Sequence, residues 1–372
     1  MKTQEFHLTV APPTTRFSAD EETSLAQQLR EIEQNTKNVS VSTPSQLSFN
    51  KAGCVQGSLR MSTTAMSQLC SMLAPGLSLF VKDLCNDKDS PDPELAIRTL
   101  NEMVRLRFRS ELEHRRLIID WPAQRIDGIV GPKYVQLSNS DLYRRSKQFV
   151  GRSGAQFHEA AVTGRRMLVQ YMNEEQISMY AKEDRPDIFH SGYHFSNSEV
   201  GECAVRAATI LIRKVCSNGA IGPVTEGGRL AHVSIVNFEE RFERLLERVR
   251  KKTAEVAIIQ KNMPMLQGCN LELGGPSEEH TKRCEYIVKR LRKGGLPKKF
   301  ASRVMTRTIL CSADDIRPLS SYDRPSISAV RSRNMYDLIN AITYESKSLP
   351  VSTRETAEHL AYTMMLGHVS FN

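Results

Sequence analysis

The apolar run at residues 204–215, with turn-forming residues at both ends, constrains the fold more than any other part of the chain. Asn197 and Gly201 precede the run, and Asn218-Gly219 follows it. Asn-Gly beside β-branched residues is the strongest short-range signal for a β-hairpin, because both residues readily adopt positive φ. The run therefore predicts a buried strand that ends in a tight turn. Its alanines at 204, 207 and 208 also fit a buried helix, so periodicity alone leaves that alternative open.

Helix and strand signals alternate along the rest of the sequence. The spacing of apolar residues predicts two short helices over 62–84, and further helices over 93–108, 141–149 and 238–263. The strand composition predicts a hairpin from 117–121 and 125–130, and another strand over 165–172. From residue 278 onward the pattern is helical.

These elements together predict an α+β fold. We expect a central antiparallel sheet built from residues 115–235, flanked by helices, with a helical C-terminal region. At 372 residues the chain is long for one core, because single cores stop growing near about 250–300 residues. We therefore expect a flexible N-terminal arm at 1–57, an α+β core domain at 58–263 and a helical C-terminal region at 264–372. The arm has few large apolar residues, so it should contribute no core.

Several motifs occur in the order found in a known family. They are residues 197–201 (NSEVG), 216–219 (CSNG) and His232, together with 128–139 (GIVGPKYVQLSN) and 335–343 (MYDLINAIT). Over residues 58–365 the chain thus resembles the phage/plasmid-like proteins known as domain of unknown function nine-three-two. The resemblance implies a protein of a mobile element, but it implies no mechanism.

A second resemblance is at the level of the fold alone. Hairpin strands followed by the helix at 238–263 resemble the annealing proteins of the RecT, Redβ and Erf type. Those proteins pair complementary single strands without ATP, in a basic groove on a sheet backed by a helix. A shared fold does not by itself give a shared function.

A basic run between residues 282 and 307 is the main candidate for contact with nucleic acid. It contains ten basic residues and one acid, Glu285. Neutralising phosphates releases condensed counterions, so such a cluster suits a polyphosphate backbone. The alternative is a solvated helix face. The basic residues are Lys282, Arg283, Lys289, Arg290, Arg292, Lys293, Lys298, Lys299, Arg303 and Arg307.

A second candidate surface interleaves basic residues with tyrosines. This pattern suits single strands, because cations follow the phosphates while aromatic rings stack on bases. The alternative is that the tyrosines belong to the edge of the core. The residues are Arg105, Arg107, Arg109, Arg115, Arg116, Lys133, Tyr134, Tyr143, Arg144, Arg145 and Lys147.

The turn motifs and the acidic-histidine cluster are weaker candidates for chemistry. Asn197, Glu199, Gly201, Asn218 and Gly219 suit a structural role in reversing the chain. The Glu199 carboxylate could also bind backbone N–H groups or an arginine such as Arg206 or Arg213. Residues 184–199 contain His190 and His194, but Gly192 between them argues against a helical metal site. We therefore expect no enzyme activity, no metal and no cofactor, and the alternative is a metal-dependent nuclease that uses this cluster.

Composition points to a protein of the cytoplasm. The eight cysteines are scattered without a C-x-x-C pair, no apolar run reaches the ~20 residues that span a bilayer, and the N-terminus lacks a signal-peptide core. With a net charge of +9, we expect binding or annealing of single-stranded DNA, with a homo-oligomer possible and no membrane partner. The alternative function is a phage or plasmid protein that antagonises a host factor without binding nucleic acid.

Overall fold

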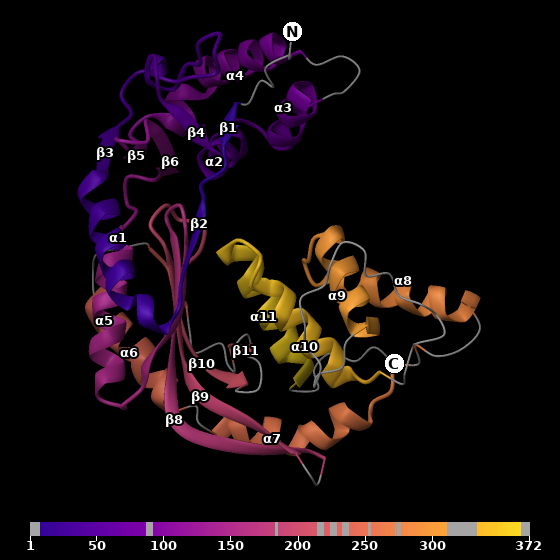
Figure 1. Cartoon of the computed structure of the whole chain (residues 1–372). Helices are drawn as coiled ribbons and strands as arrows, with labels where there is room; N and C mark the ends of the chain where they lie inside the picture. Colours follow the sequence, from indigo (N-terminus) through magenta and orange to yellow (C-terminus); the bar gives the residue numbers. More distant parts are fainter. Residues whose placement is uncertain are drawn as a thin grey trace.

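The computed structural model describes the chain apart from residues 1–7, 87–91, 183–184, 214–218, 224–228, 233–237, 252–253, 272, 274–276, 311–332 and 366–372. Two sheets flanked by helices make up the molecule, and helices form its C-terminal part (Figure 1). The predicted α+β class is confirmed.

The smaller sheet is mixed and has the strand order β1-β4-β6-β5-β3. Strands β1, β4 and β6 run parallel, whereas β5 pairs antiparallel with both β6 and β3. Helices α2, α3 and α4 and two short turns of helix, η2 and η3, share its apolar core. The bounds are β1 Thr9–Val10, β3 Thr36–Ser40, β4 Arg60–Ser62, β5 Arg116–Asp120, β6 Arg125–Val130, α2 Thr63–Leu73, α3 Leu77–Asn86, α4 Pro93–Arg107, η2 Pro44–Leu47 and η3 Phe108–Leu112.

The larger sheet is antiparallel throughout, with the order β11-β10-β9-β8-β7-β2 and β12 beside β10. Figure 1 shows α1, α5 and α6 on one face and α10 and α11 on the other. The bounds are β2 Thr14–Phe17, β7 Gln156–Thr163, β8 Arg166–Lys182, β9 Arg185–Ser198, β10 Val205–Arg213, β11 Gly219–Pro223, β12 Arg229–Leu230, η1 Ala19–Glu21, α1 Glu22–Asn35, α5 Asn139–Gly151, α6 Phe238–Lys251, α7 Ala254–Gly268, α8 Ser277–Lys293, α9 Lys298–Leu310, α10 Met335–Ser346 and α11 Val351–Met365.

Residues 205–213 of the apolar run form strand β10, as predicted. Strand β10 pairs with β9 on one side and with β11 on the other, and Arg213 lies opposite Gly219. Gly219 is therefore a residue of β11 rather than of the turn itself, and Asn218 lies outside the described residues. Over the predicted helix at 238–263 the structure has α6 and the first part of α7, and residues 252–253 between them are outside the description.

Helix starts follow the capping rules with one shift in position. Ser62 caps α2 and Asp92 caps α4, each accepting a hydrogen bond from a backbone N–H. Helix α5 begins at Asn139 with Ser138 as its cap, so the expected start at Asp141 is two residues late. The Ser138 hydroxyl accepts from the backbone N–H of Asp141, which is the hydrogen bond that an N-cap makes.

The expectation that residues 1–57 contribute no core is wrong for their described part. Leu25 and Leu29 of α1 are buried in the core of the larger sheet, beside Leu142 of α5. Leu47 and Val55 are fully buried in the core of the smaller sheet. Few apolar residues are needed here, because the segment adds β1, β2 and β3 to sheets whose other strands come from later in the chain.

The hairpin at 117–130 also lies in a different place from the one expected. Its strands, β5 and β6, belong to the smaller mixed sheet together with β1, β3 and β4. The larger sheet is formed by 156–230 and by β2. Strand order depends on pairing between distant segments, and local patterns do not encode it.

Gly128 of β6 is required for the contact between the smaller sheet and the 197–201 turn. A Cβ at this position would lie 2.5 Å from Cβ and 2.7 Å from Cγ1 of Val200. We expect Gly128→Ala to lower the free energy of unfolding by about 1–3 kcal/mol, the usual effect of overpacking. Gly151→Ala is the control, because a Cβ there meets no atom within 4 Å. Urea unfolding should separate the two variants, and equal stabilities would mean that Val200 moves aside freely.

Candidate nucleic-acid interface

The basic run at 282–307 forms two helices, α8 and α9, joined by residues 294–297. Gly295 has φ of +91°, a conformation that favours glycine, and it places buried Leu296 under the turn. Lys293 ends α8 and Lys298 begins α9, so the short connection brings together cations from the end of one helix and the start of the next.

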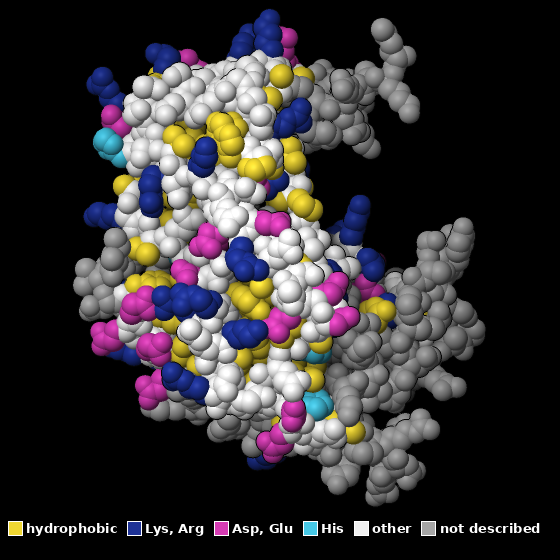
Figure 2. All heavy atoms as spheres, turned by 60° about the vertical axis from the view of Figure 1, so that its left-hand side comes forward, with side chains coloured by type: hydrophobic (Ala, Val, Ile, Leu, Met, Phe, Trp, Pro, Cys, Tyr) yellow, Lys and Arg dark blue, Asp and Glu magenta, His cyan; other side chains and the backbone are white. Residues whose placement is uncertain are grey.

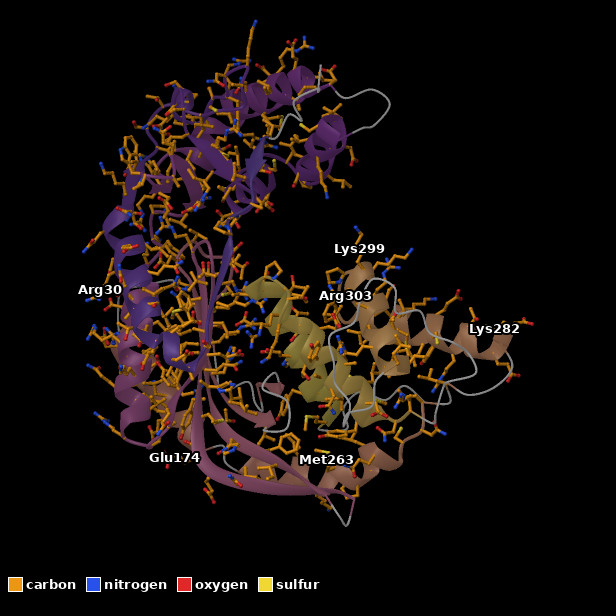
Figure 3. All side chains as sticks on the ribbon, viewed as in Figure 1. Arg30, Glu174, Met263, Lys282, Lys299 and Arg303 are labelled. Carbon is orange, nitrogen blue, oxygen red and sulfur yellow. The ribbon has the colours of Figure 1, made fainter. Side chains whose placement is uncertain are left out.

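Five cations of this hairpin are exposed, and no described carboxylate lies within ion-pair distance of them. They are Lys289, Arg292, Lys293, Lys298 and Lys299. In Figure 3, Lys299 and Arg303 project from the same end of α9, whereas Lys282 lies at the far end of α8. The cluster is therefore concentrated at the α8–α9 turn, and we call these five residues the turn cations.

The other cations of the run have protein partners. Lys282 pairs with Glu278 at 2.7 Å, and Arg303 and Arg307 both bind Glu345, at 2.7 and 2.6 Å. Arg307 is 2% exposed and its guanidinium lies over the ring of Tyr344. Arg283 donates to the backbone oxygen of Leu271. Arg283, Arg303 and Arg307 thus join α8 and α9 to neighbouring segments, whereas Lys282 pairs within α8, and all four are less available to a ligand than the turn cations.

The helix dipole makes the position of Lys298 and Lys299 informative. Both lie in the first turn of α9, which contains no acidic residue. A helix N-terminus carries a partial positive charge, so cations there are mildly destabilising and anions are stabilising. Backbone N–H groups at such an end also suit phosphate oxygens. The start of α9 thus combines two sources of positive potential at one exposed place.

An open groove of about 450 Å³ runs between α8 and α9 beside the turn cations. Val288, Met305 and Ile309 form its apolar floor. Lys289 and Arg292 lie along its α8 side, with Glu285, and Ser302 and Thr306 along its α9 side. Cys284 also lines the groove, and burial raises the pKa of its thiol.

The residues of the second predicted surface, which interleaves basic residues with tyrosines between 105 and 147, do not form one surface in the structure. The hydroxyl of Tyr134 donates to the Ser198 backbone oxygen at 2.9 Å, and its ring stacks on His232 with centroids 5.0 Å apart. Burial raises the pKa of Tyr134. Arg115 donates to the Glu111 backbone oxygen and Arg116 to that of Tyr134. Because these groups are engaged within the protein, Tyr134 does not present a free face to a base.

The remaining residues of that surface lie on α4, on α5 and in the segment after β6, and Arg109 lies in η3. Arg105 and Arg144 are exposed but pair with Glu102 and Asp141 on their own helices. Arg145 makes a bidentate pair with Glu239 of α6. Arg107 and Lys133 are exposed, and Tyr143 donates to Glu22. Figure 2 shows basic and acidic side chains intermixed on the face that it presents, which gives no continuous basic patch there.

The 197–201 turn has the structural role expected of it. Gly201 has φ of +79°, and the buried Asn197 side chain donates to the Leu137 backbone oxygen and to Asn139. Glu199 accepts from the Asn139 backbone N–H at 2.6 Å and faces Arg165 at 3.4 Å. Burial raises the pKa of Glu199, against the opposing effect of Arg165. The carboxylate therefore binds a backbone N–H and an arginine, but that arginine is neither Arg206 nor Arg213.

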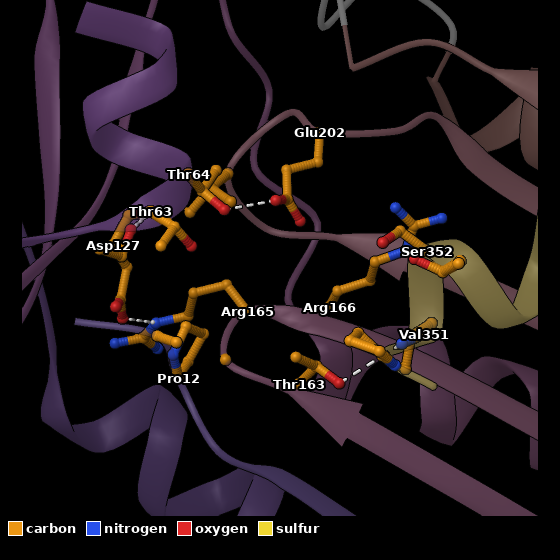
Figure 4. A pocket seen from close by; sticks show the side chains of 16 residues that line it. Pro12, Thr63, Thr64, Asp127, Thr163, Arg165, Arg166, Glu202, Val351 and Ser352 are labelled. Carbon is orange, nitrogen blue, oxygen red and sulfur yellow. Dashed lines mark hydrogen bonds and ion pairs between the residues drawn. The ribbon is translucent and has the colours of Figure 1, made fainter. Parts of the chain in front are cut away.

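A polar pocket of about 260 Å³ lies beside this turn, where the two sheets meet the start of α11 (Figure 4). Arg165 and Arg166 line it, and so do Asp127 and Glu202. Arg165 binds Asp127 at 2.6 Å, and Arg166 pairs with Glu355. Charges of both signs are thus matched within the pocket, in contrast to the surplus at the α8–α9 turn.

A buried ionic layer between the larger sheet and α11 was not anticipated from the sequence. Met167, Val169 and Tyr171 of β8 face the apolar core, so the alternate residues Arg166 and Gln170 face α11. Arg354 of α11 is 1% exposed and binds Glu159 and Glu358. Arg354 and Lys347 outweigh burial and lower the pKa of Glu159 to about 2. Alternating polar residues in β8 were the available signal, but alternation alone cannot say that a helix covers them.

His190 and His194 lie in β9 and do not converge on one site. A ring nitrogen of His190 is 2.9 Å from the Asn173 backbone oxygen, and one of His194 is 3.4 Å from Glu355. Asp184 lies outside the described residues. Among the residues that are described, no group of three or more His, Cys, Asp and Glu side chains is placed to hold a metal ion.

Comparison with known proteins adds no relative to this picture. No protein-family model, no curated protein and no solved structure matches the chain. The family resemblance carried by the sequence motifs therefore stays a prediction. Within the described part of the chain, no helix is long and apolar enough to cross a membrane.

Proposed function

We propose that this protein binds single-stranded DNA through the α8–α9 hairpin, without catalysis, as part of the DNA transactions of a mobile element. The observation that carries the proposal is the group of five exposed turn cations without described carboxylate partners. Unpaired surface cations gathered at one turn repel one another, and a polyanion relieves that repulsion. Phosphates spaced along a flexible strand suit a curved cluster of this kind.

Two features support nucleic acid over an acidic protein as the partner. Two turn cations occupy the first turn of α9, where the helix dipole adds to their attraction for phosphate. The cations include lysines on both helices, so several phosphates along a strand can be neutralised in sequence. Annealing of two strands is an extension of this proposal, since neutralised phosphates allow strands to approach each other.

Titration with salt tests the proposal directly. Binding of a fluorescent oligonucleotide to the full chain should weaken as salt rises, with a slope of log K against log[salt] near about −3.5 for five phosphate contacts to a single strand. Fluorescence anisotropy at salt concentrations from about 50 to about 300 mM would measure this slope, with the same range of protein concentrations at each salt concentration. Undetectable binding at the lowest salt would refute the proposal and favour the antagonist of a host factor.

A further inference from the structure

The groove between α8 and α9 has a composition that phosphate binding does not explain. Its floor consists of Val288, Met305 and Ile309, and the neighbouring turn cations would bind phosphates without any apolar surface. Its volume, about 450 Å³, falls in the range of small-molecule sites, about 300–1,000 Å³. The groove is thus open to solvent and large enough to hold a flat, largely apolar group.

We infer that this groove is a nucleobase subsite, in which one or two unstacked bases of the bound strand lie on the apolar floor. The inference rests on the proposed function and assigns a second role to the same hairpin. Arg292 is exposed, and its planar guanidinium can stack on a base as well as bind a phosphate. Ser302 and Thr306 on the opposite side supply hydroxyls that can bind base edges of any sequence.

The charge around the groove selects the occupant. Lys289 and Arg292 lie on its α8 side with one acid, Glu285, so an occupant that carries phosphates next to an apolar group fits best. Bases in a duplex are stacked inside the helix, whereas bases of a single strand can turn outward. The subsite therefore gives a preference for single strands that the turn cations alone would not give.

Two ligands of equal charge separate base binding from phosphate binding. One is a thymidine oligonucleotide, and the other is an abasic oligonucleotide of the same length with the same phosphates. Covering one base face with aliphatic side chains removes about 60 Å² of apolar surface from water, so the thymidine strand should bind about tenfold more tightly at equal salt. Because both strands carry the same phosphates, the phosphate contribution drops out of the ratio of the two affinities. A ratio near one, with both strands bound, overturns the subsite and leaves the proposed function standing.

Val288→Lys identifies the groove as the source of that ratio. Val288 is half-buried on α8, and a lysine there replaces apolar floor by a cation without removing any phosphate contact. The ratio should fall towards one while the abasic strand binds as well as before or better. Leu106→Lys is the matched control, because Leu106 is a 62% exposed apolar residue on another helix, α4. An unchanged ratio in Val288→Lys, or an equal fall in both variants, overturns the assignment. If the wild-type chain binds neither the thymidine strand nor the abasic strand, the proposed function is refuted together with the subsite.

Discussion

Replacing the five turn cations, Lys289, Arg292, Lys293, Lys298 and Lys299, by Gln should abolish most binding of single-stranded DNA. Each phosphate contact to a single strand contributes about 0.7 to the salt slope, so the slope should rise from about −3.5 to near zero. At about 50 mM salt the affinity should fall by two to three orders of magnitude. Gln is polar, uncharged and close to Lys and Arg in helix propensity, and all five positions are exposed, so the fold should be unaffected. Anisotropy titrations at several salt concentrations measure both quantities.

A second fivefold variant controls for net charge. Arg105, Arg144, Lys147, Arg244 and Lys282 are also exposed, but each pairs with a carboxylate, and changing them to Gln removes the same charge from a chain of net +9. This variant should keep a slope close to that of the wild type. If both variants lose affinity equally, the chain attracts DNA through its total charge and the α8–α9 hairpin is not the site.

Arg354→Met should be the most destabilising single change in the buried ionic layer, at about 3–5 kcal/mol. The guanidinium binds Glu159 of β7 and, at 2.7 Å, Glu358 of α11, and Arg354 is 1% exposed. Met fills a similar volume but leaves the half-buried Glu159 carboxylate and the buried Glu358 carboxylate without the guanidinium. Lys347 remains 3.6 Å from Glu159, which leaves Glu358 as the group without compensation. The free energy of unfolding in urea would measure the loss.

Two further variants separate charge from packing in this layer. Arg244→Met on α6 removes an exposed i,i+4 pair with Glu240 and should cost at most about 0.5 kcal/mol. Adding Glu358→Gln to Arg354→Met removes one uncompensated carboxylate, so the double variant should be more stable than Arg354→Met alone. A double variant that is less stable would mean that the loss comes from packing and not from an unpaired charge.

The ionic layer also bears on how the C-terminal helices are attached. Gln170 of β8 is fully buried, and neither atom of its amide has a hydrogen-bond partner among the described residues. Unsatisfied polar groups and ion pairs contribute less net stability than an apolar interface of the same size. The apolar contacts around Phe189 and Leu211 must therefore supply much of the attachment of α10 and α11 to the sheet.

Interactions between residues close together in the sequence determined the helices and strands and several of their ends. Turn residues around the apolar run favoured a strand for β10, because hairpin geometry depends on neighbouring residues, although the alanines of the run left a helix open. Ser62 and Asp92 could be recognised as caps, since a cap bonds to a backbone N–H two or three residues away. The cluster of cations at the α8–α9 turn was visible for the same reason, because it lies in one contiguous stretch.

Only the tertiary structure decided which cations are free and which segments share a core. Arg307 and Lys299 look alike in the basic run, yet Arg307 is buried against Glu345, which lies 38 residues away. Arg145 likewise finds its partner Glu239 at a separation of 94 residues, and Tyr134 is occupied by Ser198 and His232. The N-terminal segment joins two cores because β7 and β5 offer it free edges. Charges and strand edges that are this far apart in the sequence meet only when the whole chain has folded. No local sequence pattern therefore encodes these pairs.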